Sequence, residues 1–162
     1  MQEMNSETSQ NPGVHFPPPA LFIVAILSGC GLEAVWSIPL STLVAIPGCV
    51  LLGSVALGIG FAVLIWALSM FRRNQTAVYP NQPARLVVAG GPYQFSRNPM
   101  YVALTAITLG IALLADNLWM LLLLPVVLFV LTVFVIRREE AYLEKTFGEE
   151  YRAYQKRVRR WI

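Results

Sequence analysis

The chain has 162 residues, 56% of them hydrophobic, and a formal net charge of +3. This length fits one domain and leaves no room for an added soluble domain of the usual size. All twelve lysine and arginine residues lie in two stretches, 72–97 and 137–160. The second stretch interleaves them with glutamates, which favours contact with an anionic lipid surface. Because the sequence contains no recognisable nucleic-acid recognition module, nucleic acid is not expected as a partner.

Four long intervals carry no Asp, Glu, Lys or Arg. Each reaches or nears the roughly 20 residues that a helix needs to cross a bilayer. We therefore predict an all-α fold, an integral membrane bundle of four transmembrane helices with a cytoplasmic amphipathic C-terminal helix. The predicted transmembrane helices cover residues 20–37, 48–71, 99–114 and 118–136. Residues 1–19 are expected to form a polar leader, and residues 20–162 a single membrane domain. Because residues 1–13 lack the basic n-region of a signal peptide, the first apolar stretch is expected to be a retained helix.

The two cationic stretches also predict the topology. Lys and Arg near helix ends resist translocation, so the loop 72–98 and the tail beyond Arg137 are expected on the cytoplasmic side. The turns that carry Glu33 and Asp116 then face outward. An even number of crossings places both termini in the cytoplasm. The expected location is the cytoplasmic (inner) membrane, as a multi-pass protein in contact with membrane lipids.

The second predicted helix is rich in small residues. Ser54 with Gly58, and Ala56 with Gly60, are spaced by four residues. Such pairs allow helix backbones to approach closely in lipid. We expect both pairs to serve helix packing.

Cys30 and Cys49 both lie in apolar segments, and neither has metal-ligand spacing. We interpret them as buried small hydrophobes. The single histidine, His15, precedes a proline run in the polar leader and is expected to be solvated. The sequence therefore predicts no metal site and no catalytic histidine.

The loop 72–98 is polar, in contrast to the apolar segments before and after it. Polar loops of this length in compact domains tend to be functional or disordered. Within it, residues 87–89 are predicted to form a short extended or re-entrant piece. The next helix is expected to begin at Pro99, where the missing amide hydrogen costs nothing. Asn98 is the predicted N-cap, with its side chain accepting from a free backbone amide.

The third and fourth helices are joined by residues 115–117 alone, so they must form an antiparallel hairpin. The tail 137–160 is predicted to be an amphipathic helix, interrupted or bent near Gly148. Six apolar or aromatic residues recur on one stripe of it, namely Leu143, Phe147, Tyr151, Tyr154, Val158 and Trp161. This helix is either an interfacial anchor or a cover over a cytoplasmic pocket.

Three polar clusters meet at one membrane face in this topology, at residues 90–93, 96–101 and 137–140. Glycine in the first cluster permits close backbone approach to a ligand. Arg97 in the second offers a planar fork for a carboxylate, and the helix that follows offers free amides. The paired acids of the third can bind an amine or a sulfonium. Together these groups suit a zwitterionic ligand with one carboxylate and a nearby positive charge.

The order and spacing of these clusters resemble the isoprenylcysteine carboxyl methyltransferase and phospholipid methyltransferase superfamily. The likeness covers about Phe71 to the end of the chain. It runs through Gly-Pro-Tyr at 91–93, Arg-Asn-Pro-Met-Tyr at 97–101, one helical hairpin, Glu-Glu at 139–140 and Phe-Gly-x-x-Tyr-x-x-Tyr at 147–154. The resemblance implies a membrane enzyme that uses S-adenosylmethionine and takes a lipidic substrate sideways from the bilayer.

The resemblance also implies site residues. Those expected to bind the cofactor are Gly91, Pro92, Tyr93, Arg97, Asn98, Pro99, Tyr101, Glu139, Glu140, Tyr151 and Tyr154. Arg97 and Glu140 are expected to take part in the reaction itself. A carboxylate acceptor needs no base, whereas an amine or alcohol does, and Glu140 is then the best placed candidate.

Two positions depart from the prenylcysteine enzymes. Asn98 stands where they usually have histidine, and Val135 stands where they tend to have an arginine five residues before the second acid. Arg137 and Arg138 do not substitute for it, since they point about 200° and 300° away around a helix. These departures argue against a prenylcysteine carboxylate as substrate and favour another lipid-like nucleophile.

Two other functions remain open. Membrane sterol-type reductases that use NADPH also carry an Arg-His-Pro-x-Tyr segment and an aromatic tail. A non-enzymatic small membrane transporter or assembly subunit is the second alternative, although a transport pathway often needs an ionisable residue near the bilayer centre, which these spans lack. The methyl acceptor, the oligomeric state and the substrate entry path stay open.

Overall fold

The computed structural model of the chain describes residues 17–42, 46–74 and 86–162. The predictions for most of the polar leader, for His15 and for residues 75–85 of the loop lie outside this part of the chain. Within it, every regular element is helical, which confirms the all-α prediction.

The helices follow one another with short connections, except for the long loop between Arg73 and Gly91. In chain order they are α1 (Pro19–Val35), the single turn η2 (Leu40–Thr42), α2 (Ile46–Arg73), η3 (Gly91–Gln94), α3 (Pro99–Leu114), α4 (Leu118–Leu131), the π-helical η4 (Thr132–Ile136), α5 (Arg137–Phe147) and α6 (Glu149–Arg157). The first four long helices begin and end within a few residues of the predicted transmembrane segments.

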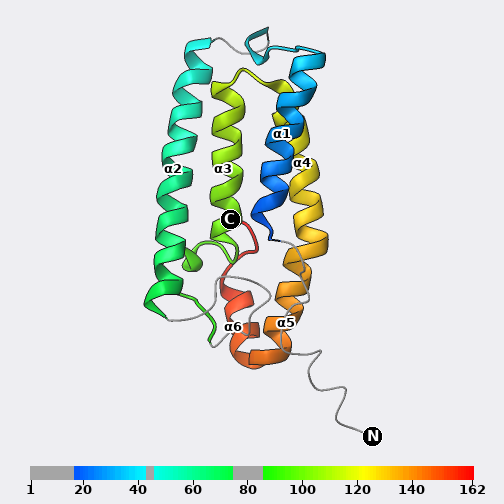
Figure 1. The fold of residues 1–162 in the computed structure, drawn as a ribbon. Helices are drawn as coiled ribbons and strands as arrows, with labels where there is room; N and C mark the ends of the chain where they lie inside the picture. The colour runs from blue at the N-terminus through cyan, green and yellow to red at the C-terminus, as the bar shows by residue number, and fades with distance from the viewer. Residues whose placement is uncertain (1–16, 43–45, 75–85) are drawn as a thin grey trace, which may run out of the picture.

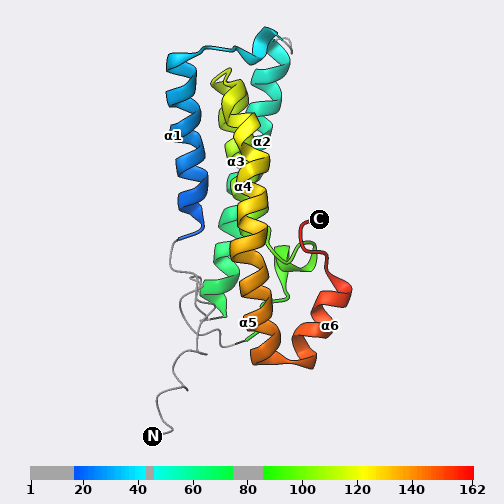
Figure 2. The ribbon, with the colours of Figure 1, turned by 90° about the vertical axis from the view of Figure 1, so that its right-hand side faces the viewer.

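The four long helices run side by side, with α3 between α2 on one side and α1 and α4 on the other (Figure 1). The hairpin predicted for α3 and α4 is confirmed. At one end of the bundle, α5, α6 and residues 86–98 lie together (Figure 2). The α1–α2 connection and the α3–α4 turn lie at the opposite end. All three polar clusters are therefore at the same end.

Helices α2 and α3 pack with their backbones close together through glycine. A Cβ atom added to Gly60 would lie 3.0 Å from the carbonyl oxygen of Ala103. One added to Gly110 would lie 2.8 Å from the carbonyl oxygen of Gly53 and 2.9 Å from the amide nitrogen of Leu57. These are backbone atoms, which cannot move aside alone.

The prediction for small residues of α2 is only partly right. Gly60 contacts α3 as expected, but Ser54 and Gly58 are exposed. A Cβ on Gly58 would meet nothing within 4 Å. The pair that faces α3 is spaced by two turns, Gly53 and Gly60, because positions seven apart return to the same side of a helix.

Helix α1 packs against α4, and much of its remaining surface is exposed. Cys30 lies on that exposed surface, whereas Cys49 of α2 is buried. The prediction that both cysteines are buried is therefore wrong for Cys30, since an apolar environment in a membrane helix does not require a protein neighbour.

The fourth predicted helix continues without a break into the tail, so that Leu118–Phe147 is one helix. Its uncharged part ends at Ile136, within a π-helical turn that shifts the faces of the helix relative to a regular α-helix. Val135 is fully buried in the bundle core, whereas Arg137 and Arg138 are exposed. Neither arginine takes the place of Val135.

The predicted tail helix 137–160 is two helices. Gly148, at φ +52°, forms the expected break between α5 and α6. Helix α6 ends at Arg157, so the prediction is wrong for residues 158–160, which are not helical. We call residues 158–162 the terminal segment. Its backbone makes hydrogen bonds to the start of α3, and these long-range contacts replace further turns of helix.

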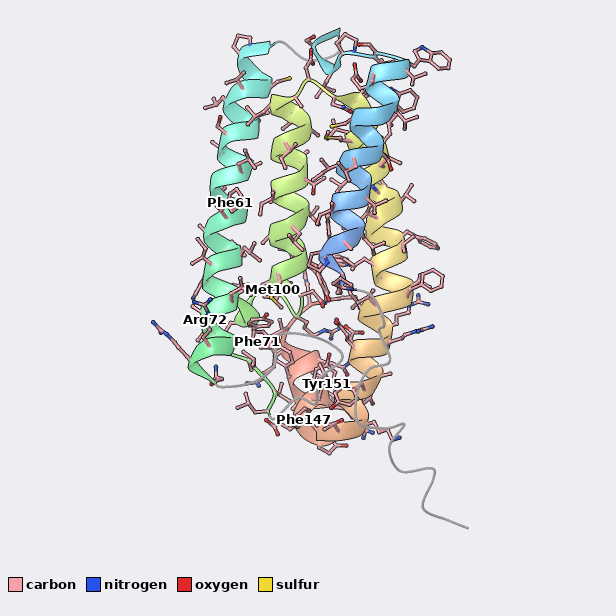
Figure 3. The ribbon with its side chains drawn as sticks, viewed as in Figure 1. Phe61, Phe71, Arg72, Met100, Phe147 and Tyr151 are labelled. Carbon is pink, nitrogen blue, oxygen red and sulfur yellow. The ribbon has the colours of Figure 1, made fainter. Side chains whose placement is uncertain are left out.

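Three of the six residues of the apolar stripe of the tail are buried by the chain itself, and the other three are half-buried. Tyr151, Tyr154 and Val158 form a cluster with Ala67 and Tyr93. Figure 3 shows Phe71, Met100, Phe147 and Tyr151 gathered at this end of the bundle. Trp161 packs instead against the core shared by α1, α3 and α4. The stripe therefore covers the ends of α2 and α3. This arrangement is the one expected if the tail is a cover and not only an interfacial anchor.

Among the residues that the structure describes, two helices, Pro47–Arg73 and Leu118–Phe147, are long and apolar enough to cross a membrane. Helices α1 and α3 are apolar but shorter. Large apolar side chains face outward along the bundle, for example Leu27, Leu51, Ile65 and Phe129. An exposed apolar surface of this extent suits lipid as the surrounding medium.

The contact between α2 and α3 can be tested at Gly110. We expect Gly110→Ala to destabilise the protein by about 1–3 kcal/mol, because the added methyl group would meet backbone atoms of α2. Gly58→Ala makes the same change at an exposed position, and it should be neutral or slightly stabilising because alanine favours a helix. Thermal unfolding in detergent measures both. Equal melting temperatures for Gly110→Ala and the unchanged protein would contradict this packing.

Candidate functional site

Glu140, on the first turn of α5, lies between two arginines. Its Oε1 accepts a hydrogen bond from Nη2 of Arg97 at 2.7 Å. Arg160 donates from Nη2 to Oε2 at 2.7 Å and from Nε to Oε1 at 3.1 Å. The side chains of Arg97 and Glu140 are each only 11% exposed. Charge-assisted bonds with so little water around them are stronger than surface ion pairs, so this cluster fixes the geometry of the site.

The terminal segment is held against the start of α3 by its backbone. The amide of Arg97 donates to the carbonyl oxygen of Arg159 at 2.9 Å. The carbonyl oxygen of Arg160 accepts from Nδ2 of Asn98 at 2.9 Å and from Oγ of Ser96 at 3.4 Å. These hydrogen bonds place the terminal segment so that the side chain of Arg160 reaches Glu140.

Asn98 does not act as predicted. Helix α3 begins at Pro99 as expected, and Asn98 occupies the N-cap position, but its side chain makes no cap hydrogen bond. It donates to Arg160 instead, and the Asn98 backbone amide donates to Oγ of Ser96 at 3.0 Å. The cap was wrongly predicted because sequence cannot show that a segment more than sixty residues away competes for the side chain.

The second acid of the pair has different surroundings. Oε1 of Glu139 accepts a hydrogen bond from the Tyr101 hydroxyl at 2.9 Å. Glu139 lies beyond Ile136, where the uncharged stretch ends. Burial raises the pKa of the Glu139 carboxyl to about 7, and the charge of Glu140 adds to this increase, whereas the Tyr101 hydrogen bond opposes it. A carboxyl group with this pKa can take up and release a proton near neutral pH.

A tyrosine of the tail binds the loop, and two further tyrosines lie beside this contact. The Tyr154 hydroxyl donates to the carbonyl oxygen of Tyr93 at 2.7 Å. The Tyr93 ring packs edge-on against Phe71, with ring centroids 5.6 Å apart. The Tyr151 ring lies 6.0 Å from that of Tyr154. Burial raises the pKa of the Tyr93 phenol above its usual value, so this group stays protonated and remains a donor.

Two buried donors at this end have no hydrogen-bond partner in the described part of the chain. They are Nε of Arg97 and the hydroxyl of Tyr93. Leaving a buried donor unsatisfied costs about 1–3 kcal/mol. A ligand that supplies acceptor oxygens here would remove that cost. A carboxylate has the acceptors that these donors require.

Gly91 serves the fold as well as the site. Its backbone has φ +59°, and an added Cβ would lie 2.5 Å from Sδ of Met70 and 3.1 Å from Nε1 of Trp66. The turn at Gly91 therefore packs directly against α2, and only glycine, which has no Cβ, fits at this position. Pro92 follows it, and the Pro92 carbonyl accepts from the amides of Phe95 and Ser96. We expected Gly91 to permit close approach of a ligand to the backbone. In the structure, the atoms close to Gly91 belong to helix α2.

The structure brings the predicted site residues to one end of the bundle and adds one that the sequence did not suggest. Arg160 was expected only to face anionic lipid. Its contact with Glu140 joins residues 20 positions apart in separate elements. No periodicity in the tail signals it, because the terminal segment has left the helix.

Comparison with known proteins gives the family. Residues 49–150, more than half of the chain, match the family model for phospholipid methyltransferases. An uncharacterised protein of Haemophilus influenzae is 47% identical over 68 residues, which are 39% of this chain and 100% of that protein. A protein-S-isoprenylcysteine O-methyltransferase of Schizosaccharomyces pombe is 38% identical over 73 residues, 45% of this chain. No solved structure matches significantly.

The matches confirm the superfamily that the motifs resemble. The chain spans only 31% of the length of the fission yeast enzyme, so the activity of that whole protein does not transfer directly. The family model itself covers the hairpin, the paired acids and the whole loop before α3. The chain therefore belongs to the phospholipid methyltransferase family, and it is a membrane methyltransferase.

Proposed function

We propose that this protein transfers a methyl group from S-adenosylmethionine to a lipidic amphiphile at the cytoplasmic face of the inner membrane. The observation that supports this most is the arrangement at one end of the bundle. There, Arg97 binds Glu140 and keeps a buried donor without a hydrogen-bond partner among the described residues, and Glu139, the residue before Glu140, has a pKa raised to about 7 by burial. This combination suits a zwitterionic methyl donor and a proton-releasing acceptor.

The proposal includes four membrane crossings with both termini in the cytoplasm. Helices α1 and α3 are short but free of charge apart from Glu33, near the end of α1. The end of the bundle with α5 and α6 carries the exposed arginines, whereas the opposite end carries Glu33 and Asp116. The excess of positive charge at the first end is typical of the cytoplasmic side.

S-adenosylmethionine supplies, when bound, a methyl group on a positively charged sulfur. Arg97 and Tyr93 would hold its carboxylate with the donors that otherwise lack a partner. The face of Tyr151 would attract its positive charge, as aromatic rings do for cations. The remaining residues expected at the cofactor are those that shape this end, namely Gly91, Pro92, Asn98, Pro99, Tyr101 and Tyr154.

The two acids have separate tasks in this proposal. Both oxygens of Glu140 already accept hydrogen bonds from guanidinium groups, so it orients Arg97. We assign the general base, first expected at Glu140, to Glu139, which can accept a proton from an amine or alcohol near neutral pH. Much of the rate acceleration would come from holding two reactants together in a water-poor site, an effect worth up to about 7–11 kcal/mol.

The family argues against the other two functions considered, an NADPH-dependent reductase and a transporter or assembly subunit. The ligand response separates all three. We expect S-adenosylmethionine and S-adenosylhomocysteine to raise the melting temperature of the purified protein, and NADPH to leave it unchanged. Stabilisation by NADPH alone would overturn the methyltransferase proposal. No response to any of the three would favour the transporter or subunit.

Glu140→Gln tests the role of the buried ion pair. We expect affinity for S-adenosylmethionine to fall about tenfold or more, because Arg97 loses the charged partner that orients it. Glu144→Gln is the matched control, since Glu144 pairs with Arg152 on the exposed side of the tail. Calorimetry measures both affinities. An unchanged affinity in Glu140→Gln would refute this role.

The base assignment predicts a pH dependence. Methyl transfer to a copurifying lipid with an amine or hydroxyl acceptor should rise with pH through about 7, as the raised pKa of Glu139 is passed and the carboxyl becomes ionised. Glu139→Gln should lower the rate by about 10²–10⁴-fold and remove this rise. The measurement is the rate at saturating donor over a pH series. A variant with the same profile as the unchanged enzyme would exclude Glu139 as the base.

The orientation is tested with reporter fusions. A fluorescent protein that folds in the cytoplasm should be bright after Ile162. Alkaline phosphatase, which requires an oxidising compartment, should be active when inserted after Asp116. Phosphatase activity at the first position with none at the second would reverse the proposed topology.

A further inference from the structure

Arg160 completes a cluster of one acidic and two basic side chains. Its guanidinium contacts both oxygens of Glu140, and Arg97 contacts one of them. A single arginine and a single carboxylate would neutralise each other. With Arg160 present the three groups together carry a net positive charge, and the side chain of Arg97 is the more buried of the two bases, at 11% exposure against 37% for Arg160.

The hydrogen bonds of Arg97 show which atoms remain available. Nη2 donates to Glu140, and Nη1 donates to the carbonyl oxygen of Gln155 at 3.3 Å. Nε is buried and has no partner among the residues that the structure describes. Because Arg160 already donates to both oxygens of Glu140, this carboxylate needs no hydrogen bond from Arg97 beyond the one from Nη2.

We propose that Arg160 is a positioning residue that preserves the positive charge of Arg97 for the carboxylate of the methyl donor. This inference rests on the proposed function, since it requires that S-adenosylmethionine binds at Arg97. Arg160 itself binds Glu140 and acts through it. Without Arg160, Arg97 and Glu140 form a neutral pair, which has no net charge to attract an incoming carboxylate.

The side chain of Arg160 is not needed to dock the terminal segment. Backbone atoms of this segment accept hydrogen bonds from Ser96, Arg97 and Asn98. Val158 and Trp161 pack into the two apolar clusters. The segment is thus held by its backbone and its apolar residues, and the charge of Arg160 is left for the contact with Glu140.

Arg159 provides a matched control. It is the neighbouring residue and carries the same charge, but its side chain is exposed. Arg159→Gln therefore removes one positive charge from the same segment without touching Glu140. Any general effect of lowering the charge of the tail appears equally in both variants.

The experiment compares two ligands that differ by one carboxylate, S-adenosylmethionine and its decarboxylated form. Calorimetry on the full-length protein in detergent gives both dissociation constants for the unchanged protein, Arg160→Gln, Arg160→Lys and Arg159→Gln. We expect the unchanged protein to prefer the carboxylated ligand. Arg160→Gln should reduce that preference about tenfold, the effect of one charge-assisted contact, while Arg159→Gln preserves it.

Arg160→Lys keeps the charge and should keep most of the preference, which also covers the case in which Arg160→Gln does not fold. A role in folding alone would weaken both ligands equally in Arg160→Gln, and that result overturns the inference. Equal effects of Arg159→Gln and Arg160→Gln would overturn it too. If the unchanged protein binds both ligands equally, the inference fails while the proposed function stands. If it binds neither, the proposed function fails with it.

Discussion

The carboxylate of Glu140 is the group on which the rest of the site depends. It lies where the chain returns from the hairpin of α3 and α4, and it binds one arginine from the loop before α3 and one from the terminal segment. Removing one partner from a buried ion pair typically costs about 3–5 kcal/mol, because the other charge stays buried. Three segments far apart in sequence thereby meet at one carboxylate. The bundle positions them, and the ion pairs fix their relative orientation.

The paired acids show how neighbours in sequence acquire different chemistry. Glu140 is surrounded by guanidinium groups, whereas Glu139 contacts a tyrosine hydroxyl and has a raised pKa. Adjacent helical positions point about 100° apart, so each side chain meets its own surroundings. The two acids thus differ in kind, since one is fixed in an ion pair and the other has a pKa raised by burial. The proposed methyl transfer uses the first for orientation and the second for proton removal.

Charge and hydropathy patterns predicted much of the fold, because membrane helices are set by long uncharged runs. The limits of α3, the α3–α4 hairpin and the break at Gly148 followed from Pro99, from the short connection and from glycine. Long-range contacts could not be predicted. Asn98 binds the terminal segment instead of capping α3, Gly53 rather than Gly58 faces α3, and the tail leaves the helix before Arg160. The motifs named residues that the fold gathers at one end of the bundle, but the spacing alone did not distinguish the surroundings of Glu139 from those of Glu140.

The most direct test is methyl transfer itself. Purified protein would be incubated with S-adenosylmethionine labelled in its methyl group and with lipids extracted from the host membrane, and label in the organic phase would be counted. We predict labelled lipid with the unchanged protein and near-complete loss with Arg97→Gln, while Arg159→Gln retains the activity. Absence of labelled lipid with the unchanged protein, or equal labelling by Arg97→Gln, would contradict it.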